Sequence, residues 1–472
     1  MEFNSWSFVA FFPVVCLLYW CIRGQRARNV MLLLASYYFY MCWNASYGLL
    51  LAASTLISYG AGLWMAGTGS RVGRKWIMGA GVVLNLALIA YFKYADFGVA
   101  TVNWVIHALG IGMQVPLPHI LLPVGVSFFV FQSVGYTVDV YRGTVAAERS
   151  VVNYALFISF FPQLVAGPIE RSGNMLPQFR ERRTFDDDKA LSGLKLMLWG
   201  YFMKLVLADR CAIYVGNVFD TPHAAGYSSL LGIFLFPFQI YGDFAGYTYI
   251  AIGSARIMGF HLNDNFNHPY FSATVSEFWR RWHISLSTWF RDYLYFPLGG
   301  SRCARWRVYF NLMVTFLASG QWHGAMWTYV AWGGVHGLCL CAERALGWNK
   351  KRFTALQRCL HVALTFVVVS LARLIYRAGS IEMAIVHFKR ALHPSNFTLG
   401  DADTRFSLLM ILVAVAIVVV KDAVEEWGSA PQIKGRAVAS VWWRDVAVVV
   451  TLVVALSVMA SPEGGTFVYF QF

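Results

Sequence analysis

The segment FLASGQWHGAMWTYVAWGGVHG, residues 316–337, is apolar enough for a lipid bilayer, yet it carries two histidines, His323 and His336. An ionisable side chain at membrane depth costs free energy and therefore indicates a functional site or a well-satisfied buried group. Histidine suits such a place because its imidazole is readily neutral and exchanges a proton near neutral pH. The segment predicts a membrane protein whose helical core holds histidines that are either functional or satisfied by a neighbouring helix.

The whole chain has the composition of a polytopic membrane protein. Of its 472 residues, 58% are hydrophobic and 13% are charged, against about 25% charged in soluble proteins. Because about 20 apolar residues span a bilayer, we expect one all-α integral membrane domain over residues 1–472, with about nine to twelve crossings. The apolar windows are 6–22, 30–66, 77–92, 119–141, 226–257, 326–342, 357–372, 406–420 and 445–460.

The net charge of +14 is explained by membrane topology without a nucleic-acid partner. Lys and Arg gather in cytoplasmic loops and meet anionic headgroups. The basic clusters at 23–28 and 71–75 predict two cytoplasmic loops, with the N-terminus outside and an apolar hairpin over 30–66, broken near Asn44. A basic mouth for a phosphate-rich ligand is the alternative use of part of this charge.

Residues 151–167 predict a broken or re-entrant helix. A full crossing there would carry four arginines to the outer side, against the excess of basic residues in cytoplasmic loops. Pro162 also interrupts the run. Irregular backbone at membrane depth is tolerated only inside protein or beside a cavity, so we expect a cavity near 160–175. The four arginines are Arg171, Arg180, Arg182 and Arg183.

A polar, aromatic stretch at 261–305 holds a third candidate histidine, His283. Within it, residues 276–296 predict one helix, because aromatic and leucine side chains recur at helical spacing. Such a helix lies at the membrane interface or in a cavity wall. His283, one turn from Trp279 and Ser287, is either an interfacial histidine or a second imidazole that orients a substrate or polarises a carbonyl. The periodic residues are Trp279, Trp282, Leu286, Trp289, Phe290 and Tyr293, interleaved with Arg280, Arg281 and Arg291.

Each candidate residue also has a purely structural interpretation. His323, flanked by an indole N–H donor at Trp322 and by Gly324, is either a catalytic base or a histidine satisfied by a neighbouring helix. His336, in the GGVHG turn, is more typical of packing than of catalysis. Asp243, within YGDFAGY, is expected in an ion pair with an arginine of a helix.

No metal site is expected, and the chain carries none of the common hydrolase or nucleotide-binding motifs. The three histidines are not at a metal-binding spacing such as HxxxH, and the cysteines form no CxxC pair. The chain has no GxSxG motif, no P-loop and no dinucleotide-binding glycine pattern.

Four blocks of sequence resemble the membrane-bound O-acyltransferase (MBOAT) family, in particular its bacterial branch that acetylates exported polysaccharides such as alginate. Two further segments, LARLIYRAGS at 371–380 and the closing FVYFQF, are weaker matches, and the resemblance covers almost the whole chain. The four blocks are LLPVGVSFFVFQSVGYTVDVYRG (121–143), FPQLVAGPIERSGNMLPQF (161–179), GFHLNDNFNHPYFSATVSEFWRRWHISLSTWFRDYLYFPLGGSR (259–302) and SGQWHGAMWTYVAWGGVHG (319–337).

The resemblance implies a fold and a set of site residues. Transmembrane helices would form a ring around a central tunnel, with re-entrant segments and a funnel on each face. The histidine of the WHG block, His323, would be catalytic, and that of the RWHISLS block, His283, would be the second marked histidine. Further residues expected along the tunnel are Trp322, Gln321, Trp279, Trp282, Ser287, Arg291, His336 and Asp243.

The chain also departs from the family pattern. Gln321 stands where relatives often have leucine, and Ala245 and Tyr249 stand where they often have serine and aspartate. These differences leave the two histidines in place but weaken any transfer of roles to residues 243–249.

The resemblance further implies an activity in the bacterial cytoplasmic (inner) membrane. The protein would hold no bound cofactor and would take acetyl groups from cytosolic acetyl-CoA toward hydroxyls of an exported polysaccharide. His323 would be the general base, and His283 or the Trp322 indole would stabilise the oxyanion. A separate periplasmic or membrane-anchored SGNH-type transferase would complete the transfer.

Other functions stay open at this point. A related activity moves D-alanine from an acidic carrier protein to a teichoic-acid-like polymer, and peptidoglycan is another acceptor for acetyl groups. A proton-coupled transporter with buried histidines would carry inverted repeats with paired broken helices, and no second half of the chain mirrors the first. A purely structural scaffold would have no use for the WHG and RWHISLS blocks.

Overall fold

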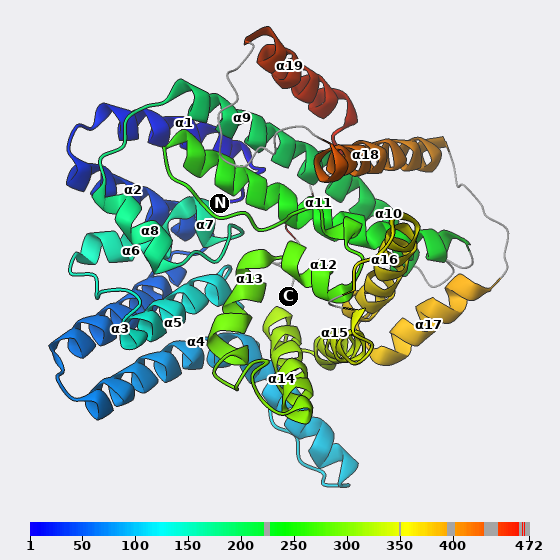
Figure 1. Ribbon diagram of the computed structural model, residues 1–472, viewed down its shortest axis with the longest axis horizontal. Coiled ribbons are helices and arrows are strands. Elements are labelled where there is room, and N and C mark those ends of the chain that lie inside the picture. The colour runs from blue at the N-terminus through cyan, green and yellow to red at the C-terminus, as the bar shows by residue number, and fades with distance from the viewer. Residues whose placement is uncertain are drawn as a thin grey trace. The chain divides into compact units, whose positions relative to one another are not determined.

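The computed structural model describes residues 1–220, 227–348, 351–393, 402–428 and 442–461, together with Gly465 and Phe467. These residues form helices and connecting segments without any β-strand, which confirms the all-α prediction (Figure 1). Most of the closing FVYFQF segment lies outside them. The chain divides into two compact units, one of Met1–Asp186, Ala255–Asn263 and Gly324–Met326, the other of Asp187–Ser254, Asp264–His323 and Trp327–Phe472. The expectation of a single domain over 1–472 stays a prediction.

The first unit is built from eight helices within its described residues. Its expected hairpin is confirmed, because α2 ends at Met41 and α3 begins at Tyr47, on either side of Asn44. Helices α3, α4 and α5 pack against one another (Figure 1). The helices are α1 (Trp6–Cys21), α2 (Gln25–Met41), α3 (Tyr47–Gly67), α4 (Arg71–Ala108), α5 (Val126–Arg142), α6 (Val151–Ser159), α7 (Phe161–Leu164) and α8 (Ser172–Arg180).

The predicted broken helix at 151–167 is confirmed. Helix α6 ends at Ser159, and the one-turn α7 begins at Phe161, with Pro162 in its first turn. Proline is tolerated there because the first N–H groups of a helix have no partner within it. The segment is buried throughout 154–170. The cavity expected near 160–175 stays a prediction.

The second unit contains the remaining helices of the described chain. They are α9 (Asp187–Tyr201), η1 (Phe202–Ala208), α10 (Asp209–Phe219), α11 (Tyr227–Ile257, whose last turn belongs to the first unit), η2 (Pro269–Phe271), α12 (Val275–Arg281), α13 (Ile284–Phe290), η3 (Arg291–Tyr295), α14 (Arg305–His323), α15 (Trp327–Ala345), α16 (Ala355–Arg377), α17 (Ile381–Leu392), α18 (Ala402–Trp427) and α19 (Trp442–Met459).

Five helical segments of the described chain are long and apolar enough to cross a membrane, so the protein is a polytopic membrane protein. Helices Trp6–Cys21 and Asp445–Met459 are shorter and also apolar. The number of crossings, their arrangement as a ring and the central tunnel stay predictions. The five segments are Tyr47–Gly67, Arg71–Ala108, Asp187–Phe219, Ala355–Arg377 and Arg405–Trp427.

The prediction of one helix over 276–296 is wrong. Helix α12 ends at Arg281, His283 has a left-handed backbone with φ of 43°, and α13 begins at Ile284. The chain then continues as the π-helix η3 from Arg291. The break places His283 at a corner between two short helices and not on the face of a continuous one.

Candidate active site

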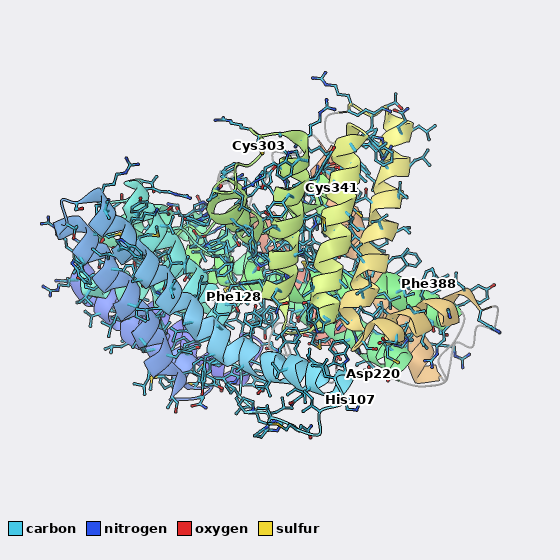
Figure 2. The ribbon with its side chains drawn as sticks, turned by 90° about the horizontal axis from the view of Figure 1, so that it is seen from below. His107, Phe128, Asp220, Cys303, Cys341 and Phe388 are labelled. Atoms are coloured by element: carbon cyan, nitrogen blue, oxygen red, sulfur yellow. The ribbon has the colours of Figure 1, made fainter. Side chains whose placement is uncertain are left out.

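The first histidine of the site, His323, is positioned by close packing of α14 against α15. These helices run side by side (Figure 1), and Figure 2 shows Cys303 and Cys341 at the same end of the pair. A Cβ atom added at Gly320 would lie 2.2 Å from the Tyr329 carbonyl oxygen, and one at Gly333 would lie 2.3 Å from that of Phe316. Only glycine at these two positions allows the observed approach. As a result, the His323 and Trp332 rings lie 4.9 Å apart.

The orientation of His323 is set by its own helix. It is the last residue of α14 and is 3% exposed. Its Nδ1 lies 2.7 Å from the Ser319 carbonyl oxygen. A carbonyl oxygen only accepts hydrogen bonds, so Nδ1 carries the hydrogen. In the neutral imidazole the lone pair is then on Nε2, which is the arrangement a general base requires.

His283 is held at its corner by Asn265. The histidine is completely buried, and its Nδ1 lies 3.2 Å from Asn265 Oδ1. The same oxygen accepts hydrogen bonds from the Ser285 N–H, at 3.1 Å, and from the Ser285 hydroxyl, at 2.8 Å. Asn265 Oδ1 is therefore an acceptor, so Nδ1 of His283 carries the hydrogen and Nε2 again carries the lone pair.

Trp322 joins the two histidines. Its ring packs edge-to-face against His323, with centroids 5.1 Å apart, and against His283, at 5.9 Å. Phe244 of α11 contacts the His283 ring at 4.6 Å. The structure thus brings the two predicted catalytic histidines into one buried aromatic cluster.

His336 belongs to the same cluster. It is 1% exposed and lies on α15, one turn from Trp332, whose ring centroid is 4.9 Å away. The indole N–H of Trp279 donates a hydrogen bond to His336 Nδ1 over 3.3 Å. The predicted residues His336 and Trp279 are therefore paired with each other. From here on, the histidine cluster means His283, His323 and His336 with Trp279, Trp322, Trp332 and Tyr376.

The other predicted residues are not members of this cluster. Trp282 is buried beneath the guanidinium of Arg373, which is 4.1 Å from its ring centroid. The Ser287 hydroxyl donates a 3.3 Å hydrogen bond to the Trp282 carbonyl and serves the local turn. Gln321 is half-buried on α14. Arg291 is on the surface, where its 53% exposed side chain pairs with Asp292 at 2.8 Å.

Asp243 is buried in an ion pair, but the expected arginine partner is wrong. Its carboxylate lies 2.7 Å from the ammonium of Lys204, which is also 2.7 Å from Asp209 and 2.9 Å from the Gly465 carbonyl oxygen. Lys204 is 1% exposed. This arrangement anchors α11 and the described end of the chain to the α9–α10 segment.

Several residues of the site were missed by sequence reasoning. Asn265, Trp332, Tyr376 and Arg373 all contact predicted residues. Tyr376 lies 5.4 Å from the Trp332 ring and 6.1 Å from that of His323. Asn265 stands in the polar run NDNFNH, and Lys204 is a single lysine in an apolar run. Those two signals were available in the sequence, whereas the contacts of Tyr376 and Arg373 depend on tertiary packing.

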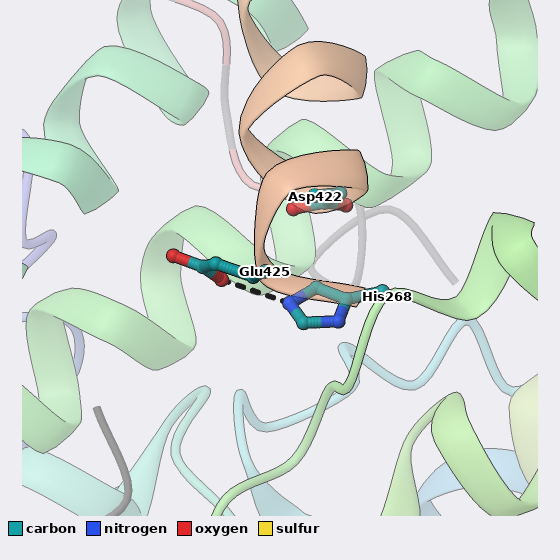
Figure 3. Close-up of side chains that lie close together, drawn as sticks. All are labelled: His268, Asp422 and Glu425. Atoms are coloured by element: carbon teal, nitrogen blue, oxygen red, sulfur yellow. Dashed lines mark hydrogen bonds and ion pairs between the residues drawn. The ribbon is translucent and has the colours of Figure 1, made fainter. Parts of the chain in front are cut away.

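One further group of side chains has the composition of a metal site. His268, Asp422 and Glu425 present ligand atoms within 4.8 Å of one another, the one such group among the described residues (Figure 3). Their contacts favour an ion-pair network instead. Glu425 is 2.8 Å from His268 and 2.8 Å from Lys421, and Asp422 accepts a hydrogen bond from Tyr241. The expectation of no metal stays a prediction.

In the first unit, the Glu170 carboxylate of the AGPIER block is almost completely buried. It accepts hydrogen bonds from the Asn263 backbone, at 2.5 Å, and from the Asn174 and Asn263 amides, each at 2.8 Å. Burial nevertheless raises the pKa of Glu170 to about 7. This glutamate therefore changes its protonation state near neutral pH.

Comparison with known proteins points to one family. The model of the membrane-bound O-acyltransferase family matches residues 145–377, which include His283, His323 and His336. The chain is 41% identical over 389 residues to the probable alginate O-acetylase of Pseudomonas aeruginosa, covering 81% of this chain and 73% of that protein. It is 33% identical over 419 residues to the peptidoglycan O-acetyltransferase of Helicobacter pylori, covering 81% and 78%. It is 30% identical over 249 residues to the teichoic acid D-alanyltransferase of Bacillus subtilis, covering 50% and 62%.

Proposed function

Because the chain belongs to the membrane-bound O-acyltransferase family and is an O-acyltransferase, we propose that it moves acetyl groups from acetyl-CoA toward hydroxyls of an exported cell-surface polysaccharide. The observation that carries this proposal is the geometry of His323. It is buried, and its Nδ1–H is bound to the Ser319 carbonyl oxygen, so its Nε2 carries the lone pair that a general base uses.

The chemical step follows from that geometry. Nε2 of His323 removes the proton from the acceptor hydroxyl as its oxygen attacks the thioester carbonyl carbon. The resulting tetrahedral intermediate collapses, the C–S bond breaks, and the CoA sulfur leaves with the proton that His323 returns. A positioned base of this kind contributes about 10²–10⁴-fold to the rate. The buried aromatic rings around His323 keep water from competing as a nucleophile.

The path of the donor is the second part of the proposal. Acetyl-CoA is cytosolic, whereas an exported polysaccharide lies across the membrane. A tunnel through the cytoplasmic (inner) membrane, within a single domain, would let the acetyl group reach His323 without moving the bulky donor across. Arginines at the cytoplasmic mouth would pair with the CoA phosphates, and a separate SGNH-type transferase outside would complete the transfer.

Alginate is the acceptor that the relatives favour. The probable alginate O-acetylase of Pseudomonas aeruginosa is 41% identical to this chain. Peptidoglycan is the second candidate, because the Helicobacter pylori relative is a peptidoglycan O-acetyltransferase. Transfer of D-alanine from a carrier protein is the third, supported by a match over half of this chain.

The test is transfer of labelled acetyl from acetyl-CoA in membranes that contain the protein and its partner transferase. We expect transfer by the wild type and by His387→Ala, and loss of transfer in His323→Ala. His387 is a matched control because it is also buried, against Phe219 on α10, and lies outside the histidine cluster. Equal transfer by His323→Ala would contradict the role of His323. If the wild type transfers only D-alanine from a charged carrier protein, the acyl donor is that carrier protein and not acetyl-CoA.

A further inference from the structure

Two buried donors of the histidine cluster have no acceptor within the part of the chain that the structure describes. His336 Nε2 and Trp332 Nε1 are buried and have no hydrogen-bond partner among the residues that the structure describes. The two side chains are 1% and 5% exposed. Buried polar groups are normally paired, so an unpaired donor calls for an explanation.

The protonation of His336 is fixed by its neighbour. Trp279 Nε1 carries a hydrogen and can only donate, so His336 Nδ1, 3.3 Å away, must accept. The hydrogen of the neutral imidazole is therefore on Nε2. Trp279 thus makes Nε2 of His336 a donor, and the indole N–H of Trp332 is a donor at any pH.

The other two histidines have the opposite arrangement. His323 and His283 both carry the hydrogen on Nδ1, bound to Ser319 and Asn265, so their Nε2 atoms accept while neutral. Neither can donate from Nε2 to a negative oxygen at the moment of attack, when His323 is still taking up the proton. The charge that develops on the thioester oxygen needs donors from elsewhere.

Trp332 connects these two kinds of histidine. Its ring lies 4.9 Å from that of His323 and 4.9 Å from that of His336. The Trp332 side chain therefore lies between the proposed base, His323, and the donor His336. Both donor atoms are enclosed by protein, so the surrounding rings must part to admit the thioester.

We propose that the Nε2–H of His336 and the Nε1–H of Trp332 form the oxyanion site of the acyl transfer, an inference that rests on the proposed function. As the acceptor oxygen bonds to the carbonyl carbon, the C=O π electrons move to the carbonyl oxygen, and these two donors bind that oxyanion. The proton of the acceptor goes to His323 Nε2. When the C–S bond breaks, the C=O bond re-forms and the oxyanion contacts weaken. Trp279 is a positioning residue that fixes the tautomer of His336.

The test separates donation from packing. Trp332→Phe keeps an aromatic ring and removes the N–H. His336→Leu removes the second donor, and His336→Gln keeps an amide N–H near the Nε2 position. The control is His387→Gln, a buried histidine outside the cluster. For each variant, kcat and KM for acetyl-CoA are measured, together with the thermal unfolding of the purified protein.

We expect Trp332→Phe and His336→Leu each to lower kcat by about 10²–10³-fold, because one oxyanion donor contributes about that much. KM should stay nearly unchanged, since the contact is made in the transition state. His336→Gln should recover most of the lost kcat, and Trp279→Phe should lower kcat less than His336→Leu does.

Three results would overturn the inference while leaving the proposed function intact. They are a normal kcat in Trp332→Phe, a loss that appears only in KM, and an equal loss in His336→Gln and His336→Leu. If His336→Leu does not fold, Trp332→Phe decides alone. Failure of the proposed function is distinguishable, because the wild type itself would then transfer no acetyl or His323→Ala would stay active.

Discussion

Lys204 is a buried charged residue in an apolar helical segment, and the local backbone geometry brings it to its ion-pair partners. The segment around it, η1, is a π-helix, in which the Asp209 N–H bonds to the Lys204 carbonyl oxygen five residues earlier. The wider turn brings the side chains of Lys204 and Asp209 to the same face, where Asp243 of α11 joins them. The charge is thereby neutralised within the protein and not exposed to lipid.

We therefore predict that Lys204→Met destabilises the protein strongly. Removal of the cation leaves two buried carboxylates, Asp209 and Asp243, without the ammonium that they share. Loss of one partner of a buried ion pair costs about 3–5 kcal/mol. Lys195→Met is the matched control, because Lys195 pairs with Asp445 at 2.6 Å but is 29% exposed. Asp445 is buried, but water reaches the Lys195 side of the pair and screens it, so loss of this lysine should cost less than loss of Lys204. Unfolding in detergent measures the stability of both variants, and an equal loss in Lys204→Met and Lys195→Met would contradict the prediction. Adding Asp209→Asn and Asp243→Asn to Lys204→Met should restore part of the lost stability.

Glu170 predicts a pH dependence of stability. Its folded pKa is raised to about 7 from an unfolded value of 4.5. The folded state thus binds the proton more tightly than the unfolded state does, so protonation of Glu170 stabilises the fold. This contribution to the free energy of unfolding is fully present below pH 4.5 and is lost as the pH rises through 7. The shift corresponds to about 3 kcal/mol. Glu170→Gln should show a smaller fall in unfolding free energy between these pH values, and an unchanged pH slope would contradict this assignment.

At the residue scale, the sequence identified the three histidines because an imidazole in an apolar segment has few ordinary explanations. It did not identify their hydrogen-bond partners. Asn265 is 18 residues from His283, and their contact depends on a left-handed turn that no periodicity reveals. Lys204 was overlooked because it interrupts the apolar run of 187–219, which the windows therefore omitted.

At the scale of elements, proline and charge gave better predictions than periodicity did. The break at 160 follows from Pro162 and from the arginines beyond it, and both are visible in the sequence. The break at 283 was missed because aromatic residues continue at helical spacing on both sides of it. A periodic pattern shows which residues are buried, and a single left-handed residue leaves that pattern unchanged.

The packing of α14 on α15 provides a test at this scale. Gly333→Ala places a Cβ atom 2.3 Å from the Phe316 carbonyl oxygen, so the helices must separate and His323 must move away from Trp332. Overpacking of this kind costs about 1–3 kcal/mol, and we expect acetyl transfer to fall as well. Gly334→Ala is the matched control, because its Cβ would lie 3.6 Å from Leu317, an ordinary contact. If Gly333→Ala and Gly334→Ala unfold at the same temperature and transfer equally, close packing of the two helices does not position the base.

At the scale of the whole molecule, composition was sufficient to identify a polytopic all-α membrane protein. The number of crossings was harder to predict, because helices such as α4 extend well beyond their apolar windows. Window 77–92 covers less than half of the 38-residue helix Arg71–Ala108. Hydropathy detects the lipid-facing part of a helix, whereas its polar ends are set by caps and by contacts with other helices.

The orientation of the first two helices is the remaining testable expectation. The basic residues at 23–28 place the end of α1 in the cytoplasm, so α2 should lead outward. Cys21 is exposed at the end of α1, and Cys42 is exposed just after α2. In cells carrying single-cysteine variants, a membrane-impermeant maleimide added from outside should label Cys42, whereas Cys21 should react only after the membrane is opened. The reverse pattern would place the basic clusters at 23–28 and 71–75 outside and contradict the two cytoplasmic loops predicted from them.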